Sequence, residues 1–120
     1  MKCVDDNVLL RGMLQTRSEG EVLVVDASGY LGSALMGDTV AKLGLDHGWS
    51  GVVIYGAIRD TGVLSTMDFG VKALGSNPKK SQKNGAGSVD VVSFGGATFV
   101  PGHWLYSDDD GIIITTRELM

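Results

Sequence analysis

Cysteine and histidine, the residues that build covalent and metal-bound scaffolds, are scarce in this sequence. Its 120 residues include one cysteine and two histidines. The single thiol, Cys3, excludes an internal disulfide and fits a reducing compartment such as the cytoplasm. We expect Cys3 to be a small buried side chain. His47 and His103 have no companion cluster of ligands, which argues against a structural zinc site.

The sequence also lacks long apolar runs and an excess of basic over acidic residues. No stretch approaches the ~20 apolar residues that a membrane-spanning helix requires, and the N-terminus lacks the basic and apolar blocks of a secretory signal. The formal net charge of -4 is opposite to the basic footprint of a nucleic-acid-binding protein. These absences predict a soluble, cytoplasmic protein with no membrane partner and no direct nucleic-acid partner.

What the sequence has in excess is glycine. Its 18 glycines stand between apolar runs without a fixed period, a pattern typical of many short elements joined by tight turns. The apolar share of 43% and the charged share of 20% are those of an ordinary globular protein. At this length we expect one domain over residues 1–120, with a single hydrophobic core.

The first half of the chain alternates helical and strand patterns. The expected elements are a helix over residues 8–14, a strand over 21–26, a glycine-studded connection over 27–37, a helix over 38–46 and a strand over 51–55. Asp5 and Asp6 are candidate N-caps for the first helix, and Gly48 is a suitable C′ residue for the second. Strand, helix and strand in this order predict a parallel crossover.

The second half changes to short strands and turns after a polar segment at residues 75–87. The expected strands are residues 69–74, 90–94, 97–100 and 112–115, with turns at Gly95-Gly96, Pro101-Gly102 and Asp110-Gly111. Crossover units followed by hairpins predict a mixed α/β sandwich rather than a fully doubly wound sheet.

One motif points toward nucleotides but is incomplete. The run V-L-V-V-D-A-S-G-Y-L-G at residues 22–32 resembles the strand-to-helix turn of a dinucleotide-binding fold. It lacks the full G-x-G-x-x-G and the acidic residue that should follow on the next strand. We assign no nucleotide site, and no convincing S-adenosylmethionine loop supports a methyltransferase.

A stronger candidate site joins two loops. The segment G-D-T-V at residues 37–40 opens the second helix, and Arg59-Asp60 follows the second expected strand. Open α/β sheets bind ligands at the carboxyl ends of their strands. Amides at a helix start favour an anion, an Arg guanidinium grips a carboxylate, and Asp60 offers a hard oxygen to a divalent metal.

Two alternatives stay open for these residues. An Asp at a helix start can be no more than a cap, and an Arg-Asp pair in a loop can be solvated surface. Neighbours on a regular strand also point to opposite faces. Arg59 and Asp60 can converge on one site if the strand has already ended, and Gly56 is a candidate for that end.

The chain resembles the RraA family, which comprises regulators of ribonuclease activity and their 4-hydroxy-4-methyl-2-oxoglutarate aldolase relatives. The resemblance is carried by G-D-T-V-A-K-L-G-L-D-H-G-W-S-G-V-V-I-Y-G-A-I-R-D at residues 37–60, with further matches at 22–26, 68–81 and 101–114. Lyase members are marked by an Asp, twenty intervening residues and Arg-Asp, the spacing of Asp38 and Arg59-Asp60. M-K-C-V-D-D-N at the start resembles an internal strand of relatives, so we expect an N-terminally shortened member.

The resemblance implies a mixed-sheet α/β/β sandwich of the swivelling phosphohistidine-domain type, assembled as a homotrimer with ligands bound between subunits. It implies substrate binding by Gly37, Asp38, Thr39, Val40 and Arg59, catalytic roles for Asp38, Arg59 and Asp60, and a divalent metal, Mg²⁺ or Mn²⁺, on Asp60. The implied reaction is cleavage of a 2-oxo acid to pyruvate, as an aldolase or an oxaloacetate decarboxylase, with the metal as Lewis acid. No lysine is an obvious candidate for a Schiff base.

Two departures from the family pattern favour weak turnover or restriction to oxaloacetate. Many members carry a carboxylate three residues after the Arg-Asp pair, where this chain has Val63. The acid that a neighbouring subunit supplies in longer aldolases has no counterpart here. The alternative function is a trimeric regulator that binds and inhibits an RNase E-type ribonuclease or an associated helicase, and residues 68–81 look more like that branch.

Other charged residues are expected to be solvated. Lys79, Lys80 and Lys83 form a small basic patch that we interpret as an exposed loop. The run of three aspartates at residues 108–110 has contiguous oxygens rather than the alternate spacing of a calcium loop. It is expected to form a tight exposed turn.

Overall fold

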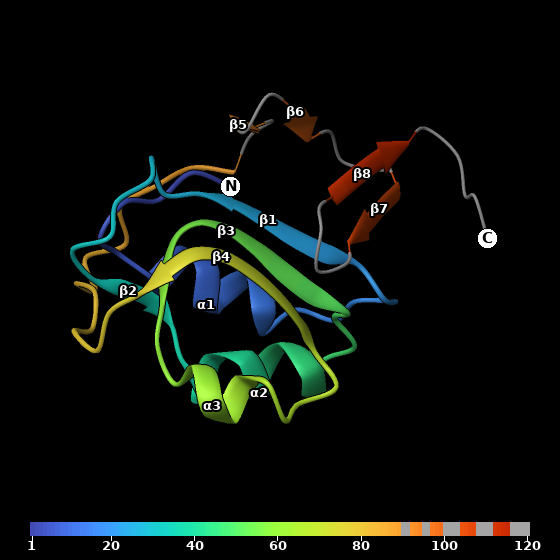
Figure 1. Cartoon of the computed structure of the whole chain (residues 1–120), viewed down its shortest axis with the longest axis horizontal. Coiled ribbons are helices and arrows are strands. Elements are labelled where there is room, and N and C mark those ends of the chain that lie inside the picture. Colours follow the sequence, from blue (N-terminus) through green and yellow to red (C-terminus); the bar gives the residue numbers. More distant parts are fainter. Residues whose placement is uncertain (90–91, 95–96, 100–103, 108–111, 116–120) are drawn as a thin grey trace.

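The computed structural model describes residues 1–89, 92–94, 97–99, 104–107 and 112–115. Within these ranges the chain forms three helices and eight strands in mixed α/β order (Figure 1). They are α1 (Val8–Leu14), β1 (Val22–Asp26), β2 (Ala34–Met36), α2 (Asp38–Asp46), β3 (Gly51–Ile58), α3 (Thr61–Leu64), β4 (Gly70–Ser76), β5 (Val92–Phe94), β6 (Ala97–Phe99), β7 (Trp104–Ser107) and β8 (Ile112–Thr115). No helix of the described part is long and apolar enough to cross a membrane.

Strand β3 is the centre of the main sheet. It pairs in parallel with β1, β2 and β4. Val52 lies opposite both Leu23 of β1 and Val71 of β4, so β1 and β4 occupy opposite edges. Ala57 lies opposite Ala34 of β2 and again opposite β4, so β2 continues the edge that β1 begins. The predicted parallel crossover is confirmed.

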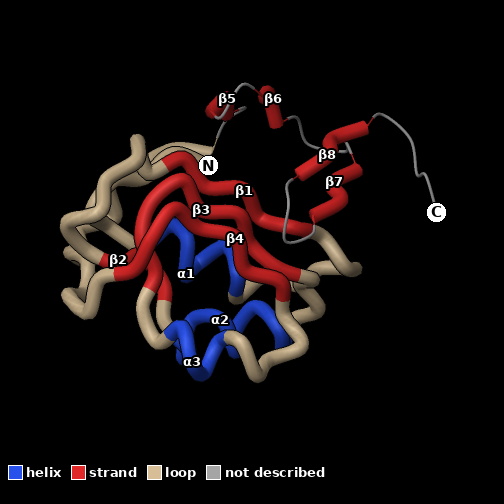
Figure 2. The backbone as a smooth tube through the Cα atoms, viewed as in Figure 1, coloured by secondary structure: helices blue, strands red, loops and turns tan. Residues whose placement is uncertain are grey.

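The helices and the hairpins lie on different sides of this sheet. Figure 2 shows the three helices on one side and the β5–β6 and β7–β8 hairpins on the other. On the helical side, Leu10 and Leu14 of α1 join the core cluster with Val25 and Ile54 of the sheet, and all four are fully buried or nearly so. On the hairpin side, Phe94 of β5 stacks on Tyr55 of β3 with ring centroids 4.8 Å apart.

Several predicted elements are confirmed. Helix α2 has the predicted bounds, residues 38–46, and Gly48 follows it with φ +94°. Antiparallel pairing of Val92 with Phe99 confirms the predicted hairpin, although Gly95-Gly96 and the other two predicted turns lie outside the described residues. Cys3 is buried, and that burial raises the pKa of its thiol to about 11.

Two predictions about the strands were wrong. The stretch 27–37 contains a strand, β2, which is too short to show a period and forms because it pairs with the end of β3. Gly56 does not end β3, which runs on to Ile58. A Cβ at Gly56 would lie 2.8 Å from the Cβ of Ala27, so this glycine allows β3 to pack closely against the residue that follows β1. Strand β7 was not predicted.

The predicted caps of α1 also need correction. Its N-cap residue is Asn7, which makes no capping bond through its side chain. Asp6 still serves the helix start, because its Oδ1 accepts the N–H of Val8 at 3.1 Å. The side chain of Asp5 turns elsewhere and accepts hydrogen bonds from Ser33 and Gln82.

Gly51 shows how closely the strands approach. A Cβ at this position would overlap the carbonyl oxygen of Gly70 on the neighbouring strand. We expect Gly51→Ala to lower the free energy of unfolding by about 1–3 kcal/mol, because overpacking forces the β3–β4 pair apart. Urea unfolding monitored by circular dichroism measures this change.

Gly12→Ala is the matched control. Gly12 lies inside α1, and a Cβ there meets nothing within 4 Å. The alanine should stabilise the helix by roughly 0.5–1 kcal/mol. Equal stability of the Gly51→Ala variant and the wild type would contradict the packing argument.

Candidate active site

The two sequence segments of the predicted site meet at the carboxyl end of the sheet. Strand β2 ends one residue before Gly37, and β3 ends at Ile58, opposite Met36. The N–H of Arg59 donates to the carbonyl oxygen of Met36 at 2.9 Å, which fixes the start of one loop against the start of the other. The start of α2 and the Arg59-Asp60 pair are therefore adjacent.

Asp60 reaches Arg59 through an unusual backbone conformation. Its φ and ψ of 58° and 38° are left-handed, and it is the N-cap residue of α3. Such a conformation costs about 1–2 kcal/mol for most residues, although Asp tolerates it better than most. The turn brings Asp60 Oδ2 to 3.0 Å from the Nη1 of Arg59. This turn, and not Gly56, brings two neighbouring side chains to one place.

The carboxylate of Asp60 also binds the helix start. Its Oδ2 accepts the N–H of Asp38 at 3.1 Å, and Asp38 Oδ1 in turn accepts the N–H of Thr39 at 2.9 Å. Two amides that were expected to bind a substrate therefore donate to carboxylates of the site itself. An anion bound at this helix start shares these donors with Asp60 and Asp38.

Gly37 is the residue on which these side chains pack. A Cβ there would overlap Asp60 Oδ2 and would lie 2.8 Å from Cζ and 2.9 Å from Nε of Arg59. Its φ of -124° is open to any residue, so the requirement for glycine comes from the close approach of the two side chains.

The surroundings keep Asp60 ionised. The hydrogen bond from the Asp38 amide has the largest effect and lowers the pKa of Asp60. Burial opposes it, and the positive charges of Arg59 and Lys80 lower the pKa further. The side chains of Arg59 and Asp60 are 25% and 30% exposed, so both remain accessible to a small ligand.

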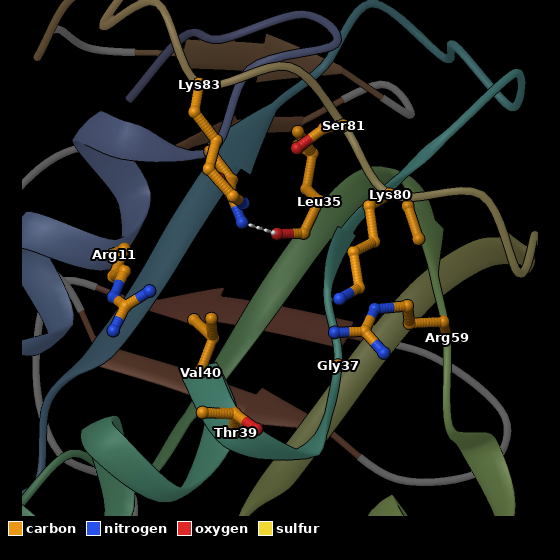
Figure 3. Close-up of a pocket in the computed structure, with 11 residues that line it drawn as sticks. Arg11, Leu35, Gly37, Thr39, Val40, Arg59, Lys80, Ser81 and Lys83 are labelled. Carbon is orange, nitrogen blue, oxygen red and sulfur yellow. Dashed lines mark hydrogen bonds between the residues drawn. The ribbon is translucent and has the colours of Figure 1, made fainter.

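Arg59 forms one wall of a cleft of about 170 Å³ (Figure 3). The start of α2 contributes Gly37, Thr39 and Val40 to the same cleft. Asp60 does not line it and contacts it through Arg59. Among the described residues that line the cleft, four side chains are cationic and none is acidic, so the potential in the cleft favours an anion over a cation.

Three of those cations were not predicted as site residues: Arg11, Lys80 and Lys83. Lys80 and Lys83 were expected in a solvated loop. A bridge between Ala34 and Lys80 lays this segment beside β2 and brings both lysines to the cleft. The run K-K-S-Q-K at residues 79–83 was the available signal. Sequence alone does not show that this run lies beside β2.

The donor set fits a divalent metal held mainly by water. Within the described ranges, no group of three or more His, Cys, Asp or Glu residues could form a protein cage. Asp60 is an ionised hard oxygen donor, with the Asp38 carboxylate next to it. Mg²⁺ accepts one or two carboxylates with several waters, whereas structural zinc needs four protein ligands.

Comparison with known proteins defines the class. Residues 1–114 match the family model described as RraA-like (Aldolase/RraA). A protein from Aromatoleum aromaticum, provisionally named 4-hydroxy-4-methyl-2-oxoglutarate aldolase, is 49% identical over 121 aligned residues that span all of this chain and 76% of that protein. The chain therefore belongs to the RraA-like family.

The fold is also found in solved structures, of which two are similar over nearly all of this chain. One, from Geobacillus kaustophilus HTA426, is described as an S-adenosylmethionine:2-dimethylmenaquinone methyltransferase; it is 41% identical with a TM-score of 0.94, over 98% of this chain and 74% of that one. The other, the RNA-processing inhibitor RraA from Thermus thermophilis, is 40% identical with a TM-score of 0.89, over 96% and 71% of the two chains. They establish a mixed α/β fold of the RraA type.

The charge network predicts how Asp60 titrates. We expect Arg59→Gln to raise the pKa of Asp60, because the variant removes a neighbouring positive charge. In the wild type the folded pKa is below the unfolded value of about 3.9. The stability from this group is therefore present above that value and is lost as pH falls through the folded pKa. Carboxyl ¹³C chemical shifts followed by NMR from pH 7 to pH 2 measure the shift.

Arg17→Gln provides the control, because Arg17 is exposed and lies outside the cleft. It should leave the titration of Asp60 unchanged. If both variants titrate like the wild type, Arg59 and Asp60 do not interact in solution as they do here.

Proposed function

We propose that this protein is a divalent-metal-dependent lyase that cleaves small 2-oxo acids to pyruvate, as a 4-hydroxy-4-methyl-2-oxoglutarate aldolase or an oxaloacetate decarboxylase. The observation that carries the proposal is the contact of Arg59 and an ionised Asp60 with the start of α2, on a cleft lined by cations. The 49% identity to a protein provisionally named as this aldolase supports the same assignment.

Arg59 and the start of α2 would bind the 2-oxo acid. The guanidinium lines the cleft and is already oriented by its hydrogen bond to Asp60. A planar guanidinium binds a carboxylate through two parallel hydrogen bonds, and the helix start favours the same negative charge. Binding in this geometry would place the 2-oxo group of the substrate near Gly37 and Asp60.

Asp60 would hold the metal, and Asp38 would support its water shell. When bound, the metal supplies a Lewis acid for the negative charge that develops on the 2-oxo oxygen as the carbon–carbon bond breaks. Arg59 and Lys80, whose positive charges act on Asp60, would stabilise the same developing negative charge. The protein itself would thus supply orientation and positive potential.

A Schiff-base mechanism has less support. Lysine nucleophiles of that class are usually activated in an apolar pocket or beside another cation. Lys80 and Lys83 share the cleft with other cations, but both residues are exposed rather than desolvated, and the ammonium of Lys83 already donates to Asn7 Oδ1 at 3.2 Å. Borohydride reduction in the presence of pyruvate distinguishes the two mechanisms, because it traps only a lysine adduct.

The charge of the cleft argues against a methyltransferase activity. S-adenosylmethionine carries a sulfonium cation at its reactive centre. The described lining of the cleft presents four cations and no acidic side chain, so it repels the group that such an enzyme must bind. The activity in the name of the Geobacillus structure therefore does not fit the cleft of this chain.

The lyase proposal predicts metal-dependent release of pyruvate. With Mg²⁺, the wild type should release pyruvate from oxaloacetate or 4-hydroxy-4-methyl-2-oxoglutarate above a protein-free metal blank. Excess EDTA should abolish the release. Asp60→Asn should lower kcat/KM by about 100-fold or more, because it removes an anionic metal ligand and a partner of Arg59. A lactate dehydrogenase-coupled assay measures the rate.

Asp46→Asn is the matched control. Asp46 is an exposed residue at the end of α2, paired with Lys42 at 3.4 Å, and its replacement should leave the rate unchanged. If folded wild type and Asp60→Asn both match the metal blank on both substrates, the lyase proposal fails. Borohydride trapping of the wild type would instead replace the metal mechanism.

The second candidate is a homotrimeric regulator that binds an RNase E-type ribonuclease or an associated helicase. The RNA-processing inhibitor RraA from Thermus thermophilis, 40% identical, favours it. The described surface also carries exposed apolar side chains in neighbouring loops and strands, namely Tyr30, Leu31 and Leu74 at 39%, 48% and 52% exposure. Such side chains are suited to a protein contact.

A regulator acts through its surface and does not need the cleft. Leu31→Asp combined with Leu74→Asp should abolish inhibition of an RNase E-type enzyme in an RNA-cleavage assay, whereas Asp60→Asn should retain it. Native mass spectrometry of each variant shows whether the assembly is intact. Absence of any inhibition by the wild type would exclude this role for the enzyme tested.

A further inference from the structure

The segment after β4 has a feature that the proposed lyase does not use. Residues 83–87 are K-N-G-A-G, and of these described residues only Lys83 lines the cleft. Asn84 and Gly85 are both exposed, and Gly85 has a φ of +84°. Any role of the Asn84-Gly85 pair is therefore independent of the lyase proposal.

An exposed asparagine followed by glycine can react with its own backbone, and asparagine is among the thermolabile residues of proteins. The Gly85 nitrogen loses its proton and attacks the side-chain carbonyl carbon of Asn84, which closes a five-membered succinimide ring. The bond from that carbon to Nδ2 breaks, and ammonia leaves with the proton that the glycine nitrogen lost. Water then opens the ring at either carbonyl and leaves an aspartate or an isoaspartate at position 84.

Glycine removes the steric barrier to this attack. A side chain on the residue after asparagine hinders the approach of the nitrogen, and Gly85 has none. The nearest atom to a Cβ at Gly85 would be a side-chain carbon of Val8, at 4.0 Å. The space around this peptide bond is therefore open.

The other two asparagines of the chain are not suited to the reaction. Asn77 precedes Pro78, whose nitrogen has no proton to lose. Asn7 is 7% exposed, and its Nδ2 donates to the carbonyl oxygen of Leu35 at 3.0 Å. Its Oδ1 accepts from the ammonium of Lys83 at 3.2 Å, so two partners fix this side chain.

A buried carboxylate holds the nitrogen that would attack. Asp6 is 2% exposed, and its Oδ1 accepts the N–H of Gly85 at 3.2 Å while its Oδ2 accepts the N–H of Asn84 at 2.6 Å. Asp6 Oδ1 also accepts the N–H of Val8 at the start of α1, at 3.1 Å. Asp6 thereby fastens the Asn84-Gly85 pair to the start of the helix.

These hydrogen bonds keep Asp6 ionised. Burial raises the pKa of Asp6, but the backbone N–H groups around the carboxylate outweigh it and hold the pKa below its usual value. Attack requires the Gly85 nitrogen to give up the proton that it donates to this carboxylate. Two negative groups would then face each other away from water, which is unfavourable.

We propose that Asn84-Gly85 is a deamidation site, and that the Asp6 carboxylate is a latch that slows the reaction while it holds this pair against α1. The reaction converts a neutral amide into a carboxylate next to Asp6, and the two negative charges repel. An isoaspartate also lengthens the backbone by a methylene group, which moves the amides away from Asp6. Once formed, the product keeps the latch open.

The first measurement compares the folded and the unfolded chain. Wild-type protein is incubated in H₂¹⁸O at mildly alkaline pH, with or without guanidinium chloride, and its peptides are analysed by mass spectrometry. The label should enter at position 84 and not at Asn77, which is the internal control. The folded chain should react at least about tenfold more slowly, because the latch is closed.

Two outcomes contradict this expectation. Equal rates in the folded and the unfolded chain would overturn the latch. Absence of the label from position 84 in both states would overturn the site.

Asp6→Asn tests the carboxylate itself. The variant keeps the size of the side chain and removes its charge, so the folded rate at Asn84 should rise by about tenfold. Gly51→Ala is the control for lost stability, since it acts on the β3–β4 pair and leaves Asp6 in place. Its rate should match that of the wild type. Equal acceleration in both variants, or a slower reaction in Asp6→Asn, would overturn the role of Asp6.

Asn84→Asp tests the open latch with Asp6 intact. It introduces the charge of the product, so hydrogen exchange of residues 82–86 should be faster than in the wild type. Asn84→Ser is the matched neutral control and should exchange like the wild type. Unchanged exchange in Asn84→Asp would contradict the opening of the latch. None of these measurements depends on pyruvate release, so the lyase proposal and this inference can fail separately.

Discussion

Parallel pairing along both edges of β3 determines where the other parts of this protein lie. Strands β1 and β2 share one edge and β4 takes the other, so the carboxyl ends of all four point the same way. The residues that come after β2 and β3 must then meet. Gly37 follows one strand and Arg59 follows the other, and their contact is a consequence of the register that places Met36 opposite Ile58.

The central strand also explains why two of the 18 glycines lie inside this strand. Gly51 and Gly56 lie within β3, at points where a Cβ would meet the backbone of β4 or the side chain of Ala27. Gly37 admits the side chains of Arg59 and Asp60 in the same way. None of the three has a positive φ. At these positions glycine allows close approach, and the turn-forming interpretation of the sequence applies to others, such as Gly48.

The parts of the fold and site that depend on local pattern could be predicted from the sequence. Helix α2 was predicted to the residue because its apolar spacing and Gly48 lie within one short segment. The pairing of Asp38 with Arg59-Asp60 was predicted from a helix start and a strand end at one edge of the sheet, and from the spacing that the RraA family shares. Strand β2 was missed because three residues carry no period, and nothing in the residues around Asp60 marks its left-handed turn.

The cationic cleft was missed for a different reason. Arg11 lies on α1, whereas Lys80 and Lys83 come after β4, and only tertiary pairing such as that of Ala34 with Lys80 brings them together. The net charge of the chain does not predict the charge of this cleft, because a chain with a net charge of -4 can still concentrate four cations at one small surface. Composition limits the class of partner for the whole surface, but it says little about the field inside a single cleft.

The two candidate functions draw on different properties of the same fold. A lyase needs the ionised Asp60, Arg59 and the cleft, whereas a regulator needs exposed side chains such as Leu31 and Leu74. A protein that acted only through its surface would have no need for the turn that brings the Asp60 carboxylate against the Arg59 guanidinium and the Asp38 amide. The contact of this ionised carboxylate with a positioned guanidinium is the feature that gives the catalytic proposal priority over the regulatory one.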